Sequence, residues 1–244
     1  MTKNLTQLIG YLKKNGYTVR KHRTSPDNSH QTIYPAATYS PWSLERRFIE
    51  TYEKIKPMTC VDIYRLYSLW NLTGQVKNLP GNILEVGVWK GGSGILMATQ
   101  AKLTNQDTTT YLCDTFSGIV KNSIRDNFHQ NGDFNDTSAK QVKSALIAND
   151  LDRVAVLQGI FPEQTCELVS APLKLAHIDV DVYDSARDAF AWIWPRLVCS
   201  GVVVFDDYGF ASCKGVTQFV NEIAGRNDAT FIYNLTGQAI LIKR

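Results

Sequence analysis

The chain has 244 residues, of which 44% are hydrophobic and 20% are charged. That composition supports a full-sized core and excludes an intrinsically disordered chain as the default. The net charge of +3, from 26 basic and 23 acidic residues, is too balanced to indicate a nucleic-acid-binding protein.

The apolar runs and the cysteines limit where the protein is expected to act. The longest apolar runs are far shorter than a membrane span, and the first residues lack the continuous apolar stretch of a signal peptide. The five cysteines are far apart and none forms a CxxC pair, which argues against a disulfide framework and against a zinc site. We therefore expect a protein of the reducing cytoplasm.

The first 80 residues are predicted to be mainly helical. Residues 4–14 have the apolar spacing of a short amphipathic helix, whereas residues 17–40 have no clean period and are rich in Ser, Thr, Pro and Asn, as in an irregular arm. A second helix is expected to begin near Pro41, at the first helical position after a serine cap, and a third to cover 59–77. We assign residues 1–80 to an N-terminal helical arm or lid.

From residue 82 the pattern alternates between strand-like apolar runs and helical segments, which predicts a parallel sheet with helices on both faces. The C-terminal segment is predicted to form two strands joined by a turn at 234–237, and they add an antiparallel hairpin. A mostly parallel sheet with a terminal hairpin is typical of class I methyltransferases and not of an ordinary dinucleotide-binding sheet. We therefore predict an α/β fold with a Rossmann-like class I methyltransferase sheet for residues 81–244. The strands are expected at 82–88, 110–114, 153–158, 174–180 and 201–206, and the helices at 92–103, 138–149, 184–197 and 214–225.

A glycine-rich turn follows the first predicted strand, in the sequence ILEVGVWKGGSG at 83–94. Glycines allow a tight turn and a close approach of a ligand, and the free amides at the start of the following helix can hold a carboxylate. The spacing, ExGxxxGGS, differs from the GxGxxG of dinucleotide-binding proteins. The second strand ends at Asp114, where an acid can accept both ribose hydroxyls of an adenosine. Asp114 does not by itself separate NAD from S-adenosylmethionine, because both carry such a ribose.

Pairs of acidic residues follow two other predicted strands. Asp179 and Asp181 end one apolar run, where strand periodicity would place them on the same side, and Asp206 and Asp207 end the next. In a parallel α/β sheet these strand ends lie along the edge where ligands bind, so the four carboxylates are expected to converge beside the glycine turn. Like charges this close need a cation or shared protons, and a hard divalent ion such as Mg²⁺ suits oxygen ligands.

The chain resembles, from about residue 40 to the end, the macrocin O-methyltransferase (TylF-like) family of metal-dependent methyltransferases that act on sugar hydroxyls. The matching blocks include LPGNILEVGVWKGGSGILMA, CDTFSG, GDFNDTS at 132–138, GIFPEQT at 159–165, HIDVDVYDSARDAF, and VVVFDDYG with CKGVTQF. The resemblance implies S-adenosyl-L-methionine and Mg²⁺ as cofactors. One departure is Val180, which stands where the family often has glycine between the paired acids.

The resemblance also implies roles for the matching residues of this chain. The residues that would line the methionine and adenosine site are Glu85, Gly87, Gly91 and Ser93, with Asp114 at the ribose and Asp136 and Thr137 near the adenine. The residues that would bind magnesium are Asp179, Asp206 and Asp207, and Asp181 would be the general base.

Together these features predict an S-adenosylmethionine-dependent O-methyltransferase that acts on a metal-activated hydroxyl of a sugar in a glycosylated natural product or glycan. A metal bound to the reacting oxygen lowers its pKa, so the substrate is expected to present two adjacent oxygens, as a vicinal diol does. A catechol-type methyltransferase with a phenolic substrate is the alternative, and a nucleotide-cofactor oxidoreductase is a more distant one. The expected partners are a small-molecule or glycan acceptor and further copies of the chain in a homo-oligomer.

Overall fold

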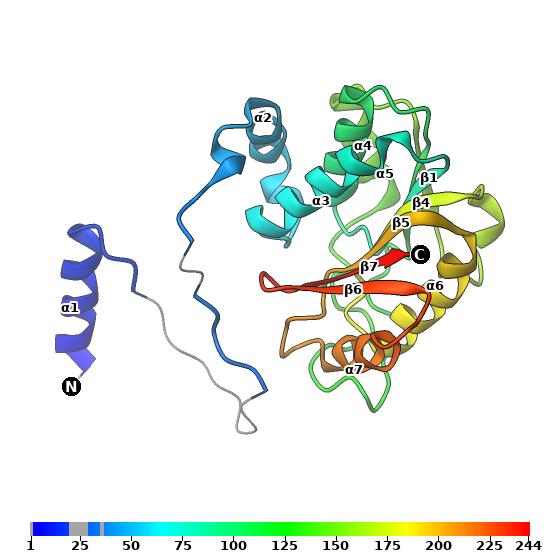
Figure 1. Ribbon diagram of the computed structural model, residues 1–244. Coiled ribbons are helices and arrows are strands. Elements are labelled where there is room, and N and C mark those ends of the chain that lie inside the picture. The colour runs from blue at the N-terminus through cyan, green and yellow to red at the C-terminus, as the bar shows by residue number, and fades with distance from the viewer. Residues whose placement is uncertain (1, 20–28, 35–36) are drawn as a thin grey trace. The chain divides into compact units, whose positions relative to one another are not determined.

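The computed structural model (Figure 1) describes residues 2–19, 29–34 and 37–244. These residues form two compact units, divided in the sequence between Thr38 and Tyr39. In the first unit, helix α1 (Thr2–Lys14) confirms the amphipathic helix expected near the N-terminus. Residues 20–28 and 35–36 of the predicted irregular arm lie outside the described residues. The lid role assigned to the first 80 residues stays a prediction.

The second unit begins with two helices, α2 (Arg46–Ile55) and α3 (Ile63–Gln75). The helix expected to start at Pro41 starts instead at Arg46, because Pro41 belongs to a separate 3₁₀ turn. Helix α3 starts where Asp62 caps it, with Asp62 Oδ1 accepting from the backbone N–H of Tyr64 at 2.9 Å and of Arg65 at 3.1 Å. The short 3₁₀ turns beside these helices are η1 (Pro41–Ser43), η2 (Lys56–Met58) and η3 (Val76–Asn78).

A seven-stranded sheet of order β3-β2-β1-β4-β5-β7-β6 lies at the centre of the second unit. Strands β1 to β5 run parallel, and β7 pairs antiparallel with both β5 and β6. The predicted parallel sheet with a C-terminal antiparallel hairpin is therefore confirmed. Its strands are β1 (Asn82–Val86), β2 (Thr110–Asp114), β3 (Val154–Gln158), β4 (Leu173–Ile178), β5 (Leu197–Phe205), β6 (Ala229–Asn234) and β7 (Gln238–Lys243).

Helices cover both faces of this sheet (Figure 1), because strands such as β5 are apolar on both sides. Val202 and Val204 pack into the core formed with α2, α3, α4 and α5, whereas Val203 and Phe205 pack into the core formed with α6 and α7. The remaining elements are α4 (Gly92–Leu103), α5 (Ala139–Ala148), the turn η4 (Cys166–Leu168), α6 (Tyr183–Arg196) and α7 (Lys214–Ile223).

The strand order reverses between β1 and β4, and this reversal positions a ligand site. From β1 the chain proceeds outward to β2 and β3, whereas β4 is followed by β5 on the other side. Open α/β sheets bind ligands in the crevice beyond the carboxyl ends of the strands at such a point. The glycine turn after β1 and the acids after β4 and β5 all lie at this edge.

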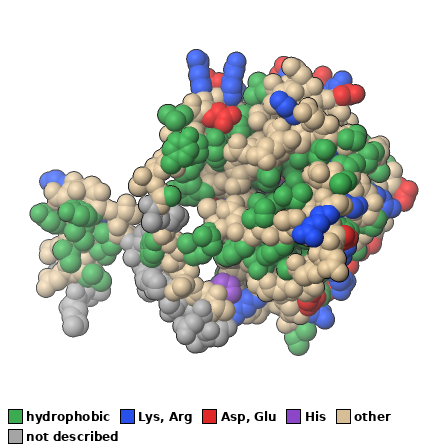
Figure 2. Space-filling model, viewed as in Figure 1, with side chains coloured by type: hydrophobic (Ala, Val, Ile, Leu, Met, Phe, Trp, Pro, Cys, Tyr) green, Lys and Arg blue, Asp and Glu red, His purple; other side chains and the backbone are tan. Residues whose placement is uncertain are grey.

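The visible face in Figure 2 carries basic and acidic side chains that are interspersed. Among the described helices, none combines the length and the apolar character needed to cross a membrane.

Candidate active site

A cavity of about 310 Å³ opens at the carboxyl ends of β1, β2, β4 and β5. Seven of the predicted site residues line it, namely Gly87, Ser93, Asp114, Asp179, Asp181, Asp206 and Asp207. Four others lie outside its lining, namely Glu85, Gly91, Asp136 and Thr137. The structure therefore brings the four aspartates and the glycine turn together, and gives the remaining predicted residues supporting positions.

The glycine turn is held tightly against the end of β4. Gly87 has φ of +86°, a left-handed conformation, and a Cβ atom there would lie 1.8 Å from the carbonyl oxygen of Asp179. The backbone N–H of Asp179 in turn donates to the carbonyl of Val86 at 2.9 Å. Only glycine fits this position, because any side chain would push the two strand ends apart.

Replacing Gly87 with alanine is expected to lower the free energy of unfolding by about 3 kcal/mol or more, since backbone strain and a steric clash add together. Thermal or urea unfolding would measure the loss. Gly225→Ala is the matched control, because a Cβ atom at Gly225 would meet nothing within 4 Å. Equal stability of the two variants would contradict this account of the turn.

Asp114, at the end of β2, holds the same turn through hydrogen bonds to its backbone. Its Oδ2 accepts from the backbone N–H of Val88 at 2.7 Å and of Trp89 at 2.8 Å, and its Oδ1 accepts from the N–H of Phe116 at 2.6 Å. The carboxylate also lines the cavity, so binding of a ribose there would share it with these backbone donors. Asp114 thus has a structural role in the turn, and its role at a ribose stays a prediction.

Asp136 and Thr137 hold Trp89, whose side chain lines the cavity. Asp136 accepts from Trp89 Nε1 at 2.7 Å and from Lys90 Nζ at 2.7 Å, and Thr137 Oγ1 donates to the carbonyl of Trp89 at 2.5 Å. The hydrogen bond from Lys90, with that from Trp89, holds the pKa of Asp136 below its ordinary value. These two residues therefore act on the cavity through Trp89.

The four aspartates converge through a turn, not through strand alternation as the sequence suggested. Strand β4 ends at Ile178, so Asp179 and Asp181 lie beyond it, and Asp181 has φ of +64°. Asp207 Oδ2 accepts from the backbone N–H of Val180 at 3.1 Å and of Asp181 at 2.8 Å. The acid after β5 thereby sets the conformation of the segment after β4.

The four aspartates differ in the direction in which the protein shifts their pKa values. Burial, together with the neighbouring carboxylates, raises the pKa of Asp179 and Asp181 well above the ordinary value and raises that of Asp207. Burial also opposes ionisation of Asp206, but the contacts of Asp206 with His177 and Arg65 outweigh it, and its pKa is lowered. Asp206 is therefore the acid whose charge the protein itself compensates.

Below the cavity, Asp206 belongs to a buried row of ion pairs, in which Glu85 contacts His177, His177 contacts Asp206, and Asp206 contacts Arg65. We call this row the column. Glu85 and His177 are fully buried, and Glu85 Oε1 lies 2.9 Å from His177 Nδ1. His177 Nε2 lies 3.4 Å from Asp206 Oδ1, which also accepts from Gln238 Nε2 at 2.8 Å. Burial disfavours the charged imidazole, but Asp206 and Glu85 together raise the pKa of His177 well above its ordinary value. Glu85 thus acts on Asp206 indirectly, because it favours the charged form of His177, which in turn stabilises the charged form of Asp206.

Arg65 of α3 closes this column from the helical side and was missed by the sequence reasoning. Its guanidinium forms ion pairs with Asp62, at 2.9 Å, and with Asp206, and it lies over the ring of Phe210 at 4.5 Å from the centroid. The sequence shows the i,i+3 pair of Asp62 and Arg65, but nothing in it places α3 against the end of β5.

A second set of side chains at the cavity was also missed. His129, Asp181 and Cys213 approach one another to within 3.7 Å, although His129 and Cys213 are 84 residues apart. The sequence expectation that histidine and cysteine form no zinc-type set rested on local spacing, whereas the structure brings one histidine, one cysteine and one aspartate close together. No local motif signals this set, because each member comes from a different element.

Comparisons with known proteins find relatives of this chain by sequence and by structure. The chain is 28% identical over 170 residues, 60% of its length, to 8-demethyl-8-(2,3-dimethoxy-alpha-L-rhamnosyl)-tetracenomycin-C 4'-O-methyltransferase of Streptomyces olivaceus. It is 27% identical over 182 residues, 70% of its length, to demethyldecarbamoylnovobiocin O-methyltransferase of Streptomyces niveus. These matches span 64% and 69% of the two relatives.

Solved structures establish the class I methyltransferase fold. The structure of the O-methyltransferase NovP superposes with a TM-score of 0.68 at 24% identity, covering 76% of this chain and 82% of that one. The calicheamicin methyltransferase CalS11 superposes with a TM-score of 0.64 at 20% identity, covering 84% of this chain and 94% of that one. The family model of macrocin-O-methyltransferase (TylF) matches residues 20–232. The chain belongs to the macrocin-O-methyltransferase (TylF) family.

Proposed function

We propose that this chain is an S-adenosylmethionine-dependent O-methyltransferase that methylates a sugar hydroxyl with the help of a hard divalent cation, most simply Mg²⁺. The observation that carries the proposal is the excess of buried negative charge beside the glycine turn. Five acids gather there: Glu85, Asp206 and Asp207 are buried, and Asp179 and Asp181 are half-buried. Among the described residues, the basic side chains that form ion pairs with them are Arg65, His177 and His129.

The donor set suits a hard cation. The side chain of Asp179 makes no hydrogen bond or ion pair with any other described residue, and its carboxylate lines the cavity next to Asp206 and Asp207. Oxygen ligands of this kind are those that Mg²⁺ prefers. Asp179, Asp206 and Asp207 are therefore the residues that would hold the cation, which when bound would stabilise negative charge developing on the acceptor oxygen.

The cofactor fits the other part of the cavity. The open glycine backbone at Gly87, the start of α4 at Ser93 and the carboxylate of Asp114 lie together at its lining, beside Trp89. This combination suits an adenosine with a charged amino-acid tail. One similar solved structure is that of an O-methyltransferase from Bacillus cereus in complex with SAH.

Asp181 is suited to act as the general base. Its carboxylate lines the cavity, and burial beside Asp207 raises its pKa, which makes it a stronger proton acceptor than an exposed aspartate. Asp207 fixes its position through the two backbone hydrogen bonds to the turn. Asp181 would take the proton of the acceptor hydroxyl as the oxygen attacks the methyl group. Alignment of that oxygen with the methyl group can contribute an effective molarity of roughly 10⁵–10⁸ M.

The names of the relatives support the acceptor class, because they specify a rhamnosyl-tetracenomycin, demethyldecarbamoylnovobiocin and mycinamicin III. We infer a sugar with adjacent hydroxyls in a glycosylated natural product or glycan. The cytoplasmic location and the homo-oligomer stay predictions from the sequence.

A panel of glycosides and catechols, incubated with S-adenosylmethionine and Mg²⁺, tests the acceptor class by mass spectrometry. The proposal expects a methylated glycoside and no methylated catechol. Methylation of catechols alone would assign the phenolic alternative. Calorimetry with S-adenosylhomocysteine and with NAD tests the cofactor class, and binding of NAD alone would overturn the proposed activity.

The metal-free protein is expected to lose stability as the pH rises through the ordinary values of aspartate, about 4, and of histidine, about 6.5. Asp179, Asp181 and Asp207 have raised pKa values, so the folded state holds protons that the unfolded state releases above the ordinary aspartate value. The raised pKa of His177 acts in the same direction, because its stabilisation is full below the unfolded value and is lost as the pH passes the folded one. Among the four clustered aspartates, Asp206 alone has a lowered pKa, so it stabilises the fold above the unfolded value and loses this effect in acid.

Thermal unfolding across this pH range, with a chelator or with Mg²⁺, measures the effect. With Mg²⁺ bound, the loss of stability with rising pH is expected to be smaller, because the cation replaces the protons shared among the acids. A metal-free protein that gains stability over the same range would contradict the assigned pKa directions.

A further inference from the structure

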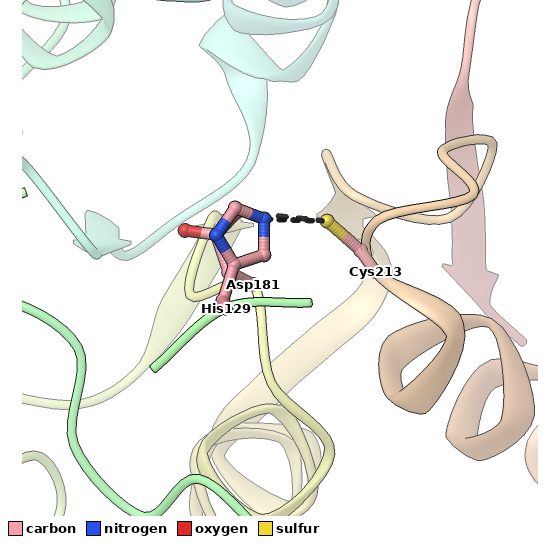
Figure 3. A group of neighbouring side chains, drawn as sticks. All are labelled: His129, Asp181 and Cys213. Atoms are coloured by element: carbon pink, nitrogen blue, oxygen red, sulfur yellow. Dashed lines mark hydrogen bonds and ion pairs between the residues drawn. The ribbon is translucent and has the colours of Figure 1, made fainter. Parts of the chain in front are cut away.

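Cys213, His129 and Asp181 meet at the cavity from three separate parts of the chain (Figure 3). Cys213 immediately precedes α7, His129 lies between β2 and α5, and Asp181 follows β4. Cys213 Sγ lies 3.7 Å from His129 Nε2 and 3.5 Å from Asp181 Oδ1, and those two atoms lie 3.4 Å apart. Cys213 is buried, so this sulfur is shielded from bulk water while it faces the other two donors.

These separations are those of ligand atoms around a tetrahedral metal ion. In a zinc site, bonds of about 2.0–2.3 Å place neighbouring ligand atoms roughly 3.3–3.7 Å apart. A fourth donor is close, because Asp207 Oδ1 lies 3.6 Å from Cys213 Sγ. The set therefore offers one sulfur, one imidazole nitrogen and carboxylate oxygen.

The imidazole of His129 is oriented as in many metal sites. Its other nitrogen, Nδ1, lies 3.7 Å from Asp133 Oδ2, and its ring contacts the rings of Phe128 and Phe134, with centroids 5.0 and 5.8 Å away. A carboxylate behind a metal-bound histidine is a common arrangement, although the 3.7 Å separation here is longer than a hydrogen bond. The aromatic contacts limit rotation of the ring further.

We propose that His129, Cys213 and Asp181 form a binding site for a thiophilic divalent cation, Zn²⁺, chemically distinct from the sulfur-free set of Asp179, Asp206 and Asp207, beside which His177 lies. Sulfur and imidazole ligands select zinc-like ions, whereas Mg²⁺ takes oxygen ligands. Zinc at this site would occupy Asp181. If Asp181 is the general base, Zn²⁺ bound there inhibits methyl transfer even when Mg²⁺ is present. This consequence rests on the proposed function.

Titration of the metal-free protein with Co²⁺, followed by near-ultraviolet absorption, tests the site. The wild type is expected to develop a thiolate-to-metal charge-transfer band that saturates as Co²⁺ is added, and only Co²⁺ bound at Cys213 contributes to this band. The band should be absent in Cys213→Ser, and His129→Gln should bind Co²⁺ at least about tenfold more weakly. Cys60→Ser is the matched control, because Cys60 lines the same cavity outside the set and its loss should leave the band unchanged.

A wild type without the band, or a band that persists in Cys213→Ser and disappears in Cys60→Ser, would overturn the proposed site. Because a folding defect in Cys213→Ser would imitate loss of the site, its circular dichroism is compared with the wild type, and His129→Gln gives an independent arm. The functional consequence is tested separately, with each protein measured against its own zinc-free rate. Zn²⁺ should inhibit the wild type more strongly than Cys213→Ser. A normal cobalt band without inhibition by Zn²⁺ would support the metal site and would show that Asp181 is not the general base.

Discussion

Asp179→Asn is expected to lower Mg²⁺-dependent methyl transfer by at least about a hundredfold while leaving the metal-free fold as stable as the wild type or more so. The substitution removes one ionisable carboxyl group from a cluster in which burial and the neighbouring acids already raise the pKa of Asp179 and so oppose its charge. No hydrogen bond of another described side chain is lost with that charge. The asparagine therefore relieves repulsion in the metal-free protein and removes a ligand from the proposed cation site.

Two measurements check this expectation together. Initial rates with S-adenosylmethionine and a competent acceptor give the loss of activity, and thermal unfolding with and without Mg²⁺ gives the stabilisation by the cation. The stabilisation should be lost in Asp179→Asn and kept in the control Asp107→Asn, whose side chain is 98% exposed. A variant that still responds to Mg²⁺ like the wild type would exclude Asp179 as a ligand.

Asp206→Ala is expected to have the opposite effect on stability, with a loss of about 3–5 kcal/mol in the free energy of unfolding. Asp206 is the counter-charge of Arg65 and of His177, and it accepts a hydrogen bond from Gln238. Removing it leaves two buried cations without their shared partner. Asp206→Asn should cost less than Asp206→Ala, because the amide oxygen can still accept from Gln238.

Denaturant unfolding of both variants, compared with Asp107→Ala, measures the difference between the two. An exposed ion pair such as that of Asp107 contributes at most about 1 kcal/mol, so the control should remain close to the wild type. If Asp206→Ala were as stable as Asp107→Ala, the column from Glu85 to Arg65 would not contribute to the fold as described.

Much of the fold could be predicted from the sequence because its strands carry a strong local signal. Runs such as the one that ends at Phe205 are apolar at successive positions, which indicates a strand buried on both faces, and the glycine-rich turn marks the end of the first strand. The predicted start of the second helix was wrong, since the proline signal at Pro41 belongs to a 3₁₀ turn. A proline fixes its own φ but does not determine whether the next residues continue as an α-helix or stop after one 3₁₀ turn.

The candidate site was predictable to the extent that it lies at strand ends. The parallel sheet places both pairs of aspartates at one edge, but it predicts neither the turn that positions Asp181 nor the different environments of the four acids. The sequence makes Asp179 and Asp206 look equivalent, whereas only Asp206 meets a cation from α3 and another from β4. The partners of Asp206 come from 141 positions away for Arg65 and 32 for Gln238, and no local pattern encodes such contacts.

The same limit explains the supporting residues. Asp136 and Thr137 were placed near an adenine by resemblance, and in the structure they bind Trp89, 47 and 48 positions earlier. The set of His129 and Cys213 likewise depends on how the segment after β2 folds over the cavity. Side-chain contacts of this kind arise from tertiary packing, so they become visible only when the elements are placed in space.

The most direct test is anomalous diffraction from crystals grown with Mn²⁺, as a stand-in for Mg²⁺, and S-adenosylhomocysteine. The account predicts a manganese peak within bonding distance, about 2.1 Å, of the carboxylates of Asp179, Asp206 and Asp207, with the cofactor product along the glycine turn beside it. A manganese peak away from these acids, or a cofactor bound outside this cavity, would contradict it.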